Sequence, residues 1–463
     1  MDWLFLVISS GCFVGVFLHL NILHRALELT KIPQNVFRII RSSGVSDHWK
    51  EKALPRYSLR LLSQSLTIFV LLLISFSPFV FFALFSTLMD GQFISLVSSL
   101  KGIAVSSLTA ILFAKILSGK STCDYGVSAR LLHQFVLGSS FFGETLFDIE
   151  KAIHGSKARD VSNGKHVFVA GLARAGTTIL MRTLYENGNF CSLTYRDMPF
   201  ILAPNTWRTF SNLSTRNVEK RERAHGDGIK VDYDSPEALE EVFWRAFSGS
   251  DYIKKDYLTP MVADGTVVEN FRSFVSIILK IAPDKCYLSK NNNNILRLDS
   301  IIKAFPESLI VVPFREPLQQ AFSLRNQHNK FVNEEDPFTK KYMTWLVHHE
   351  FGADHRPFLF NEQIGTEEGT EKLSYWLQLW INTYSYLLEK LPAQAMFLSY
   401  ELLCDDTEHV WQELSEKIDL TPHNESITFS KSISLKEDDI PQDLLSHATE
   451  IYEKLTNRSI GFR

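Results

Sequence analysis

An eight-residue loop has the composition of a phosphate-binding loop. It follows the apolar stretch Val167–Ala170 and leads into a segment with helical spacing. Main-chain N–H groups at a helix N-terminus, with the positive end of the helix dipole, bind anions. Glycines permit a tight turn, hydroxyls add donors, and an arginine gives paired contacts to phosphate or sulfate oxygens. The loop supplies all of these groups in the order Gly171, Leu172, Ala173, Arg174, Ala175, Gly176, Thr177 and Thr178.

The spacing of this loop also resembles that of nucleoside triphosphatases, but one essential residue differs. In the Walker pattern G-x4-G-K-[ST] the lysine contacts the terminal phosphates, and Thr177 stands at its position here. A second strand ending in a magnesium-binding aspartate is not evident either, because Arg315 follows the strand-like stretch Leu309–Phe314. A P-loop kinase or nucleotide hydrolase with a degenerate lysine is therefore kept as the alternative interpretation.

A second anion-binding element begins at Arg315. This residue leaves the end of the apolar stretch Leu309–Phe314, and the carboxyl ends of strands are where open α/β sheets bind ligands. Pro317 can begin a helix, which places Ser323 about two turns along it. The arginine charge and the serine hydroxyl together suit a terminal phosphate.

The two elements, in this order along the chain, resemble the sulfotransferases that use 3′-phosphoadenosine 5′-phosphosulfate (PAPS), in particular membrane-anchored members of bacterial type. The resemblance implies that Gly171–Thr178 binds the 5′-phosphosulfate, with Ala175 in place of the usual serine, and that Arg315 and Ser323 hold the 3′-phosphate. It covers roughly residues 165–405, and three further segments support it: Tyr287–Asn291, Ala304–Ser308 and Tyr400–Leu402. A membrane-bound relative that has lost its activity is the third interpretation.

The resemblance also implies PAPS as cosubstrate and no metal ion. Sulfuryl transfer then requires stabilisation of the charge on the bridging and sulfuryl oxygens. Arg174 and Lys290 are the candidates for this role, because Lys290 ends a predicted strand and could reach the bridging oxygen. A solvated surface lysine is the alternative interpretation of Lys290.

The base that deprotonates the acceptor hydroxyl has two candidate locations. Related sulfotransferases carry an acidic residue in the region of Asp197, which is the first candidate; a salt bridge to Arg196 or a helix cap is the alternative. The second is a polar cluster whose spacing is not His-Glu-x-x-His, so we do not predict a zinc site. Its residues are His348, His349, Glu350, Asp354, His355 and Arg356. The run Asn291–Asn294 is either part of the acceptor site or a turn.

Strands that alternate with helices must position these groups. That alternation predicts an α/β domain, like the P-loop fold, with a central, mainly parallel sheet flanked by helices. The predicted strands are Val167–Ala170, Cys191–Tyr195, Cys286–Ser289, Leu309–Phe314 and Ala395–Tyr400. The predicted helices between them are Thr178–Asn187, Ser273–Ile281, Leu296–Ala304 and Trp376–Lys390.

Long apolar runs precede this domain. We predict a transmembrane region over residues 1–118, a helical connector over 119–164 and the sulfotransferase-like domain over 165–463. Trp3–Leu23 and Leu61–Met89 carry no formal charge and are long enough to span a bilayer. Ile94–Leu117 is a third candidate, interrupted by Lys101, whose stem could snorkel to the interface.

The loop between the first two runs determines the predicted orientation. It holds eight lysines and arginines against three acidic residues between positions 24 and 60, which favours the cytoplasm. Three spans then place the domain in the cytoplasm; a lumenal Golgi domain is the alternative for a eukaryotic protein. The membrane anchor makes a lipid, glycolipid or membrane-linked glycan the expected acceptor.

The overall composition excludes several other classes of protein. The 463 residues carry a net charge of −4, which gives no basic face for nucleic acid. Five cysteines are present, an odd number without a Cys-x-x-Cys pair. A disulfide framework and a zinc ribbon are therefore not expected.

Overall fold

The computed structural model divides into two compact units, residues 1–135 and 136–463. Each unit is described by itself, and the division falls within the predicted connector. The structure describes residues 2–20, 22, 25–26, 29, 32–33, 36, 47–88, 91–99, 101–103, 105–107, 109–110, 127–155, 159–211, 221–222, 230–231, 234–334, 336–360, 369–420, 429 and 440–462.

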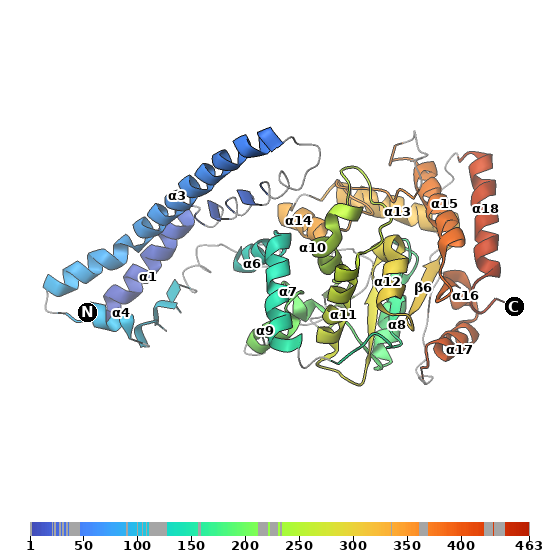
Figure 1. The fold of residues 1–463 in the computed structure, drawn as a ribbon, viewed down its shortest axis with the longest axis horizontal. Helices are drawn as coiled ribbons and strands as arrows, with labels where there is room; N and C mark the ends of the chain where they lie inside the picture. The colour runs from blue at the N-terminus through green and yellow to red at the C-terminus, as the bar shows by residue number, and fades with distance from the viewer. Residues whose placement is uncertain are drawn as a thin grey trace. The chain divides into compact units, whose positions relative to one another are not determined.

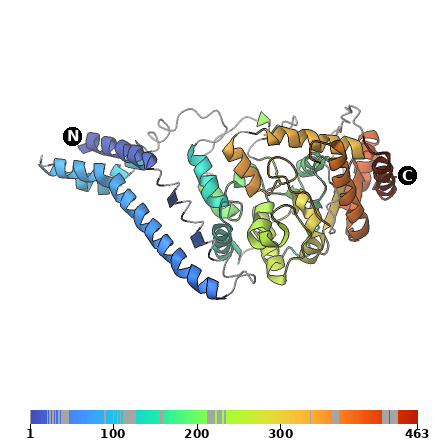
Figure 2. The ribbon, with the colours of Figure 1, turned by 90° about the horizontal axis from the view of Figure 1, so that it is seen from above.

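The first unit contains two long helices that lie side by side (Figure 2). Helix α1 (Asp2–His19) packs against α3 (Asp47–Leu88). Stacked phenylalanines join them, with a distance of 5.2 Å between the ring centroids of Phe5 and Phe82. Among the described residues, one helical stretch, the 33 residues Pro55–Thr87 of α3, is long and apolar enough to cross a membrane.

The first and third predicted spans have different outcomes. Helix α1 forms over most of the first run, but its apolar part is shorter than a typical span. In the third run, α4 (Phe93–Ser98) stops where Ser99 takes an extended conformation, with φ −75° and ψ 150°. Residues 111–126 lie outside the described residues, so the third span stays a prediction.

Two helices follow in the connector, α6 (Val127–Leu137) and α7 (Ser140–His154). The Ser139 hydroxyl caps α7 by accepting a hydrogen bond from the N–H of Phe142 at 3.4 Å. On the inner face of α7, Phe147 is fully buried among aromatic rings of α10 (Glu241–Tyr252) and α11 (Gly265–Leu279). Helix α7 is therefore packed into the second unit.

A five-stranded parallel sheet forms the centre of the second unit, as predicted (Figure 1). Its spatial order is β2-β5-β1-β6-β7, and every neighbouring pair is parallel. The strands are β1 (Val167–Val169), β2 (Phe190–Cys191), β5 (Cys286–Lys290), β6 (Leu309–Phe314) and β7 (Ala395–Ser399). The short β1 lies in the middle, between β5 and β6.

Helices cover both faces of this sheet. On one face, α8 (Thr177–Glu186) and α17 (Thr407–Lys417) pack over Val167, Val169 and their neighbours. The opposite face holds the larger core, which includes Phe168 and buried residues of α11, α12 (Leu298–Ala304) and α15 (Leu373–Lys390). Consecutive β-strand residues alternate between these two faces, as the pleat requires.

Several element boundaries differ from the predicted ones: α11 begins at Gly265, eight residues before the predicted Ser273, and α15 (Leu373–Lys390) begins three residues early. Two further boundaries moved for local reasons. Strand β2 ends at Cys191, because the chain turns into the 3₁₀ helix η2 (Tyr195–Asp197). Another 3₁₀ helix, η3 (Asn292–Arg297), precedes α12, which begins at Leu298 and not at Leu296. Short polar side chains that bond to the backbone cause both turns.

The remaining elements complete the second unit. They are α9 (Pro204–Ser211), β3 (Arg221–Glu222), β4 (Lys230–Val231), α12 (Leu298–Ala304), α13 (Pro317–Val332), α14 (Pro337–Trp345), α15 (Leu373–Lys390), α16 (Tyr400–Asp405) and α18 (Gln442–Asn457).

Candidate functional site

The sheet topology brings three predicted site elements to one edge. Val169 near the end of β1 lies opposite Lys290 of β5 on one side and Val311 of β6 on the other. The glycine loop after β1, Lys290 and Arg315 therefore meet at the carboxyl edge of the sheet. Ligands of open α/β sheets bind at this edge.

The glycine loop has the backbone shape of an anion cradle. Gly176 caps α8 with φ 85°, a left-handed conformation that glycine adopts without steric cost. A side chain at this position would place its Cβ 2.5 Å from the ring of Tyr400. Thr177 and Thr178 form the first turn of α8, where N–H groups have no acceptor within the helix. The loop thus has the close backbone approach that a phosphate or sulfate group needs.

The preceding part of the loop is also specialised. Arg174 has φ 70°, which is uncommon for a residue with a side chain. Its neighbour Ala175, which stands where the resemblance leads one to expect a serine, is fully buried and has no hydroxyl to donate. Backbone conformation and the arginine, more than a serine donor, define this loop.

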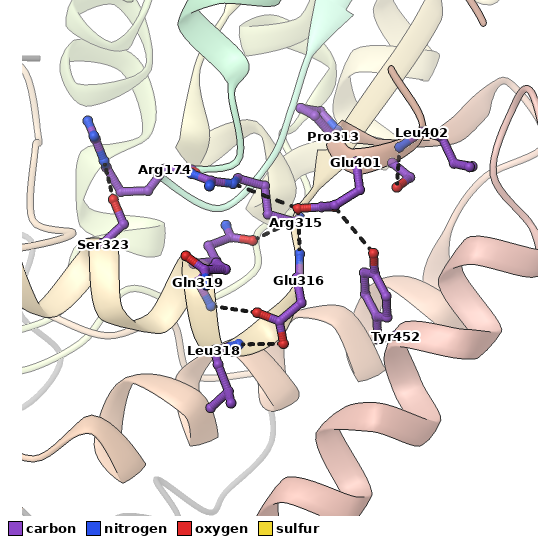
Figure 3. Close-up of polar contacts among 12 residues, drawn as sticks. Arg174, Pro313, Arg315, Glu316, Leu318, Gln319, Ser323, Glu401, Leu402 and Tyr452 are labelled. Carbon is purple, nitrogen blue, oxygen red and sulfur yellow. Dashed lines mark hydrogen bonds and ion pairs between the residues drawn. The ribbon is translucent and has the colours of Figure 1, made fainter. Parts of the chain in front are cut away.

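Arg174 and Ser323 connect the two predicted anion-binding elements. The Nε of Arg174 donates to the Oγ of Ser323 at 2.9 Å, across 149 residues of sequence. Nη1 of Arg315 donates to the carbonyl oxygen of Arg174 at 3.5 Å. Figure 3 shows Arg174 and Ser323 on one side of Arg315, with Glu401 and Tyr452 on the other. The structure therefore brings together three of the predicted donor-binding residues, Arg174, Arg315 and Ser323.

A second layer of residues holds Arg315. Its guanidinium lies 5.2 Å from the ring centroid of Tyr400 and 4.0 Å from the carboxylate of Glu401. Glu401 also accepts a hydrogen bond from the N–H of Glu316 at 3.1 Å and from the hydroxyl of Tyr452 at 3.3 Å. Burial raises the pKa of Glu401. The Tyr400–Leu402 motif thus supports the arginine after β6.

Gln320 was not a sequence-predicted site residue. It is fully buried, and its Nε2 donates to the carbonyl of Ala173 at 3.0 Å. Its Oε1 accepts from the N–H of Arg315 at 3.2 Å and from the indole of Trp380 at 3.0 Å. One side chain therefore fixes both anion-binding elements. The sequence offered one signal for this residue, its position one turn into the helix that begins at Pro317. That signal is weak, because a glutamine at such a position has no sequence pattern that predicts its burial.

Lys290 is the last residue of β5, and its side chain is buried. The asparagine run follows at once and forms the turn into η3. Asn291 caps this turn, with its side chain accepting from the N–H of Asn293 at 3.0 Å. The Nδ2 of Asn292 donates to Oε1 of Glu350 at 2.6 Å, and that of Asn293 to the carbonyl of Val347 at 3.2 Å. The run Asn291–Asn294 forms a turn, and its side chains also bind the 347–350 segment.

The histidine-rich cluster divides into two parts. His348 Nδ1 lies 3.5 Å from Oε2 of Glu350. Burial alone would raise the pKa of Glu350, but the charge of His348 and hydrogen bonds from His348 and Asn292 outweigh it and hold the pKa at about 2. His349 instead contacts the carbonyl and the carboxylate of Asp354, at 2.9 and 3.2 Å.

The backbone beside this cluster is strained. Val347 has φ 52°, a left-handed conformation that is rare for a β-branched residue. Such a conformation costs about 1–3 kcal/mol and persists only where the surroundings enforce it. Val347 is fully buried, and Asn293 binds its carbonyl.

Asp197, the first candidate for the base, has a different setting. Its Oδ2 accepts from the N–H of Thr194 at 2.9 Å and from the Thr194 hydroxyl at 3.3 Å. Its other oxygen lies 2.7 Å from Arg208. Arg196, the partner considered from the sequence, pairs with Asp234 at 2.8 Å. Asp197 is fully buried, and burial raises its pKa. Asp197 closes a capping box and forms an ion pair. These are the structural roles considered from the sequence as the alternative to a catalytic base.

Known families identify the chain. The model of the sulfotransferase family matches residues 166–425, which is more than half of the chain. The protein therefore belongs to the sulfotransferase family.

Three solved structures are similar in fold. Sulfotransferase STF1 of Mycobacterium tuberculosis has 16% identity and a TM-score of 0.37, with 68% of this chain and 83% of that chain covered. STF9 of Mycobacterium avium has 13% identity and a TM-score of 0.39, covering 75% and 89%. A sulfotransferase of Alicyclobacillus acidocaldarius has 13% identity and a TM-score of 0.32, covering 63% and 93%. A search of curated proteins found no match.

Proposed function

We propose that this sulfotransferase takes its sulfuryl group from PAPS and transfers it to a hydroxyl of a membrane-associated lipid, glycolipid or glycan. The observation that supports the donor most strongly is the contact of Arg174 with Ser323 at 2.9 Å. It joins a loop suited to a phosphosulfate with a helix suited to a terminal phosphate. PAPS carries two such anionic groups on one nucleoside.

The residues fit this donor by shape and by charge. The loop at Gly176 has no room for a side chain beside Tyr400, which leaves its N–H groups close to a bound anion. Arg174, Lys290 and Arg315 supply positive charge against the phosphates and the leaving bridging oxygen. In the reaction, the acceptor oxygen forms a bond to sulfur while the bond from sulfur to the phosphate oxygen breaks. Adenosine 3′,5′-bisphosphate leaves with that electron pair.

Binding of adenosine 3′,5′-bisphosphate to the detergent-solubilised full chain tests the donor site. Arg174→Ala and Arg315→Ala should each weaken binding, measured by calorimetry, by about 1.5–3 kcal/mol, the scale of a charged hydrogen bond. Lys454→Ala is the control, because Lys454 is a surface cation of α18 that pairs with Glu450 one turn earlier on the same helix. Unchanged affinity in both arginine variants, or tighter binding of ATP with magnesium, would remove the assignment.

The membrane part supports an acceptor held at a bilayer. The apolar stretch Pro55–Thr87 is the candidate span. The basic loop before it favours a cytoplasmic position, and PAPS is a cytosolic compound in cells without a transporter for it. Both constraints are met by three spans, an external N-terminus and a cytoplasmic catalytic domain.

Cysteine labelling tests this topology. Asn163 lies in an exposed turn just before β1. An Asn163→Cys variant should react with an impermeant thiol reagent only after the cells are opened. Labelling in intact cells would overturn the three-span arrangement and indicate two spans with an external domain.

A further inference from the structure

We infer that His348, oriented by Glu350 and Asn292, is the base that takes the proton of the acceptor hydroxyl. The inference rests on the proposed sulfuryl transfer, and it gives the acceptor side of the site a location. His348 is then a catalytic residue, whereas Glu350 and Asn292 are positioning residues.

The first argument is the place of the 347–352 segment above the sheet. Asn292 and Asn293, which follow β5, bind Glu350 and the carbonyl of Val347. From the side of β6, His328 of α13 accepts a hydrogen bond from the N–H of Gly352 at 3.2 Å. The two anchors of the segment therefore lie on elements that follow β5 and β6, the two neighbours of β1 in the sheet.

The second argument is distance along the supporting elements. Asn292 is two residues beyond Lys290, which is at most about 7 Å of extended chain. His328 is five residues beyond Ser323 on one helix, about 7.5 Å along its axis. The segment is therefore anchored within one or two turns of two residues of the proposed donor site. An acceptor hydroxyl must enter at such a position to reach the sulfur.

The third argument is the local chemistry. A histidine with one ring nitrogen directed at a carboxylate presents its other nitrogen as a base in a fixed tautomer. His348 Nδ1 faces Oε2 of Glu350 at 3.5 Å, and Oε1 of Glu350 is fixed by Asn292 at 2.6 Å.

Unsatisfied polar atoms lie in the same turn. The side-chain oxygens of Asn292 and Asn293 and both amide atoms of Asn294 are buried without a hydrogen-bond partner. Buried polar groups in native proteins are nearly always paired with protein or water. These amides are available to bind the acceptor or the water that it displaces, next to the carboxylate that orients His348.

Strain at Val347 points to the same segment. The left-handed backbone of Val347 sets the direction of the chain at His348, which follows α14 and the turn after it. Outliers of this kind persist where function requires a particular direction of a side chain.

The proton and electron balance is simple. The acceptor O–H gives its proton to Nε2 of His348, and the oxygen lone pair forms the new bond to sulfur. The bond from sulfur to the phosphate oxygen breaks, and the bisphosphate takes its electrons. Other titratable groups packed around this position also affect the pH dependence: Lys290, His328, His349, Asp354 and His355.

Single-turnover release of adenosine 3′,5′-bisphosphate from PAPS tests the inference. The full chain is used in an amine-oxide detergent, which has no hydroxyl, with octyl β-glucoside as acceptor probe and water as background acceptor. His348→Ala and Glu350→Gln should each slow release by roughly 10²–10⁴-fold. Added imidazole should partly restore His348→Ala, and the decline of the wild-type rate in acid should be absent from that variant. Binding of the bisphosphate, measured by calorimetry, should stay unchanged in both.

Two controls separate this role from damage to the fold. Glu150→Gln removes the charge of an equally buried glutamate that caps α9 through the N–H of Asn205 at 2.8 Å. His447→Ala removes an exposed histidine of α18. Both should keep the wild-type rate and pH profile.

Three outcomes decide the matter. Full rates in His348→Ala and Glu350→Gln, with an inactive Asp197→Asn, would overturn the inference and return the base to Asp197. Loss of activity in His348→Ala without rescue by imidazole and with weakened bisphosphate binding would also overturn it. A wild-type chain that binds the bisphosphate but never releases it from PAPS would instead refute the proposed function.

Discussion

Two buried carboxylates, Asp197 in the turn after β2 and Glu350 in the segment after α14, have opposite surroundings. Asp197 faces Arg208 and the turn of its own capping box, so its oxygens complete a local structure. Glu350 faces a histidine and an asparagine from distant parts of the chain. Burial raises the pKa of Asp197, whereas the partners of Glu350 hold its pKa at about 2 despite burial.

The difference teaches how to separate structural from chemical carboxylates. The partners of Asp197 are a guanidinium and the main-chain N–H and hydroxyl of its own turn, which is the setting of a structural carboxylate. A carboxylate beside an imidazole has a neighbour that can carry a proton onward. Both are buried carboxylates, so only their partners distinguish the two roles.

Removal of Asp197 should give the largest loss of stability. Asp197→Ala leaves the guanidinium of Arg208, with only 13% of its side chain exposed, without its carboxylate. Breaking a buried ion pair in this way costs about 3–5 kcal/mol. Chemical denaturation of the solubilised chain, followed by tryptophan fluorescence, measures the free energy of unfolding.

The neighbouring ion pair supplies the control. Arg196 and Asp234 have side chains that are 39% and 68% exposed, so Arg196→Ala should cost no more than about 1 kcal/mol. Equal losses in Asp197→Ala and Arg196→Ala would show that Asp197 does not have the structural role assigned to it.

Glu350 should contribute less stability, and its contribution should depend on pH. Its pKa in the folded chain, about 2, lies below the ordinary value of 4.5. A carboxylate whose pKa is lowered by folding stabilises the folded chain at pH values above its pKa in the unfolded chain. This contribution is lost as the pH falls through its pKa in the folded chain. Glu350→Gln should therefore lower the free energy of unfolding by at most about 3 kcal/mol, a value reached where His348 carries its charge.

The same measurement at lower pH gives the discriminating result. Between pH 4.5 and about 2 the difference in stability between wild type and Glu350→Gln should shrink. A difference that stays constant from pH 7 to pH 3 would mean that the charge of Glu350 has no favourable partner, and the comparison with Asp197 would fail.

The donor side of the site could be predicted from the sequence because its signals are local. Apolar strand residues, two glycines and a helix start within a dozen positions define the loop at Gly176. Arg315, Pro317 and Ser323 likewise follow one strand. Each of these patterns comes from backbone conformation and side-chain periodicity, which neighbouring residues determine.

The acceptor side could not be predicted in the same way, because it is made by contacts between distant residues. Asn292 and Glu350 are 58 positions apart, and nothing in either local sequence specifies their pairing. The positive φ of Val347 and the capping box at Asp197 depend equally on packing that propensities do not describe. For this reason the sequence left Asp197 and the histidine cluster as alternatives, and their different partners in the structure are the grounds for the inference that favours His348.

The smallest expected effect concerns the hydroxyl of Thr194. Thr194→Val keeps the shape of the side chain and the main-chain N–H that donates to Asp197 at 2.9 Å, but removes the hydroxyl bond at 3.3 Å. A single neutral donor to a carboxylate that retains two other partners contributes about 1 kcal/mol or less. The free energy of unfolding should fall by that amount, while the single-turnover rate with PAPS should stay at the wild-type value. In Thr194→Val, Asp197 would still be buried and paired with Arg208. A rate decrease of tenfold or more could then arise only if the exact position of the Asp197 carboxylate mattered for the chemistry. That result would place Asp197 beside the acceptor.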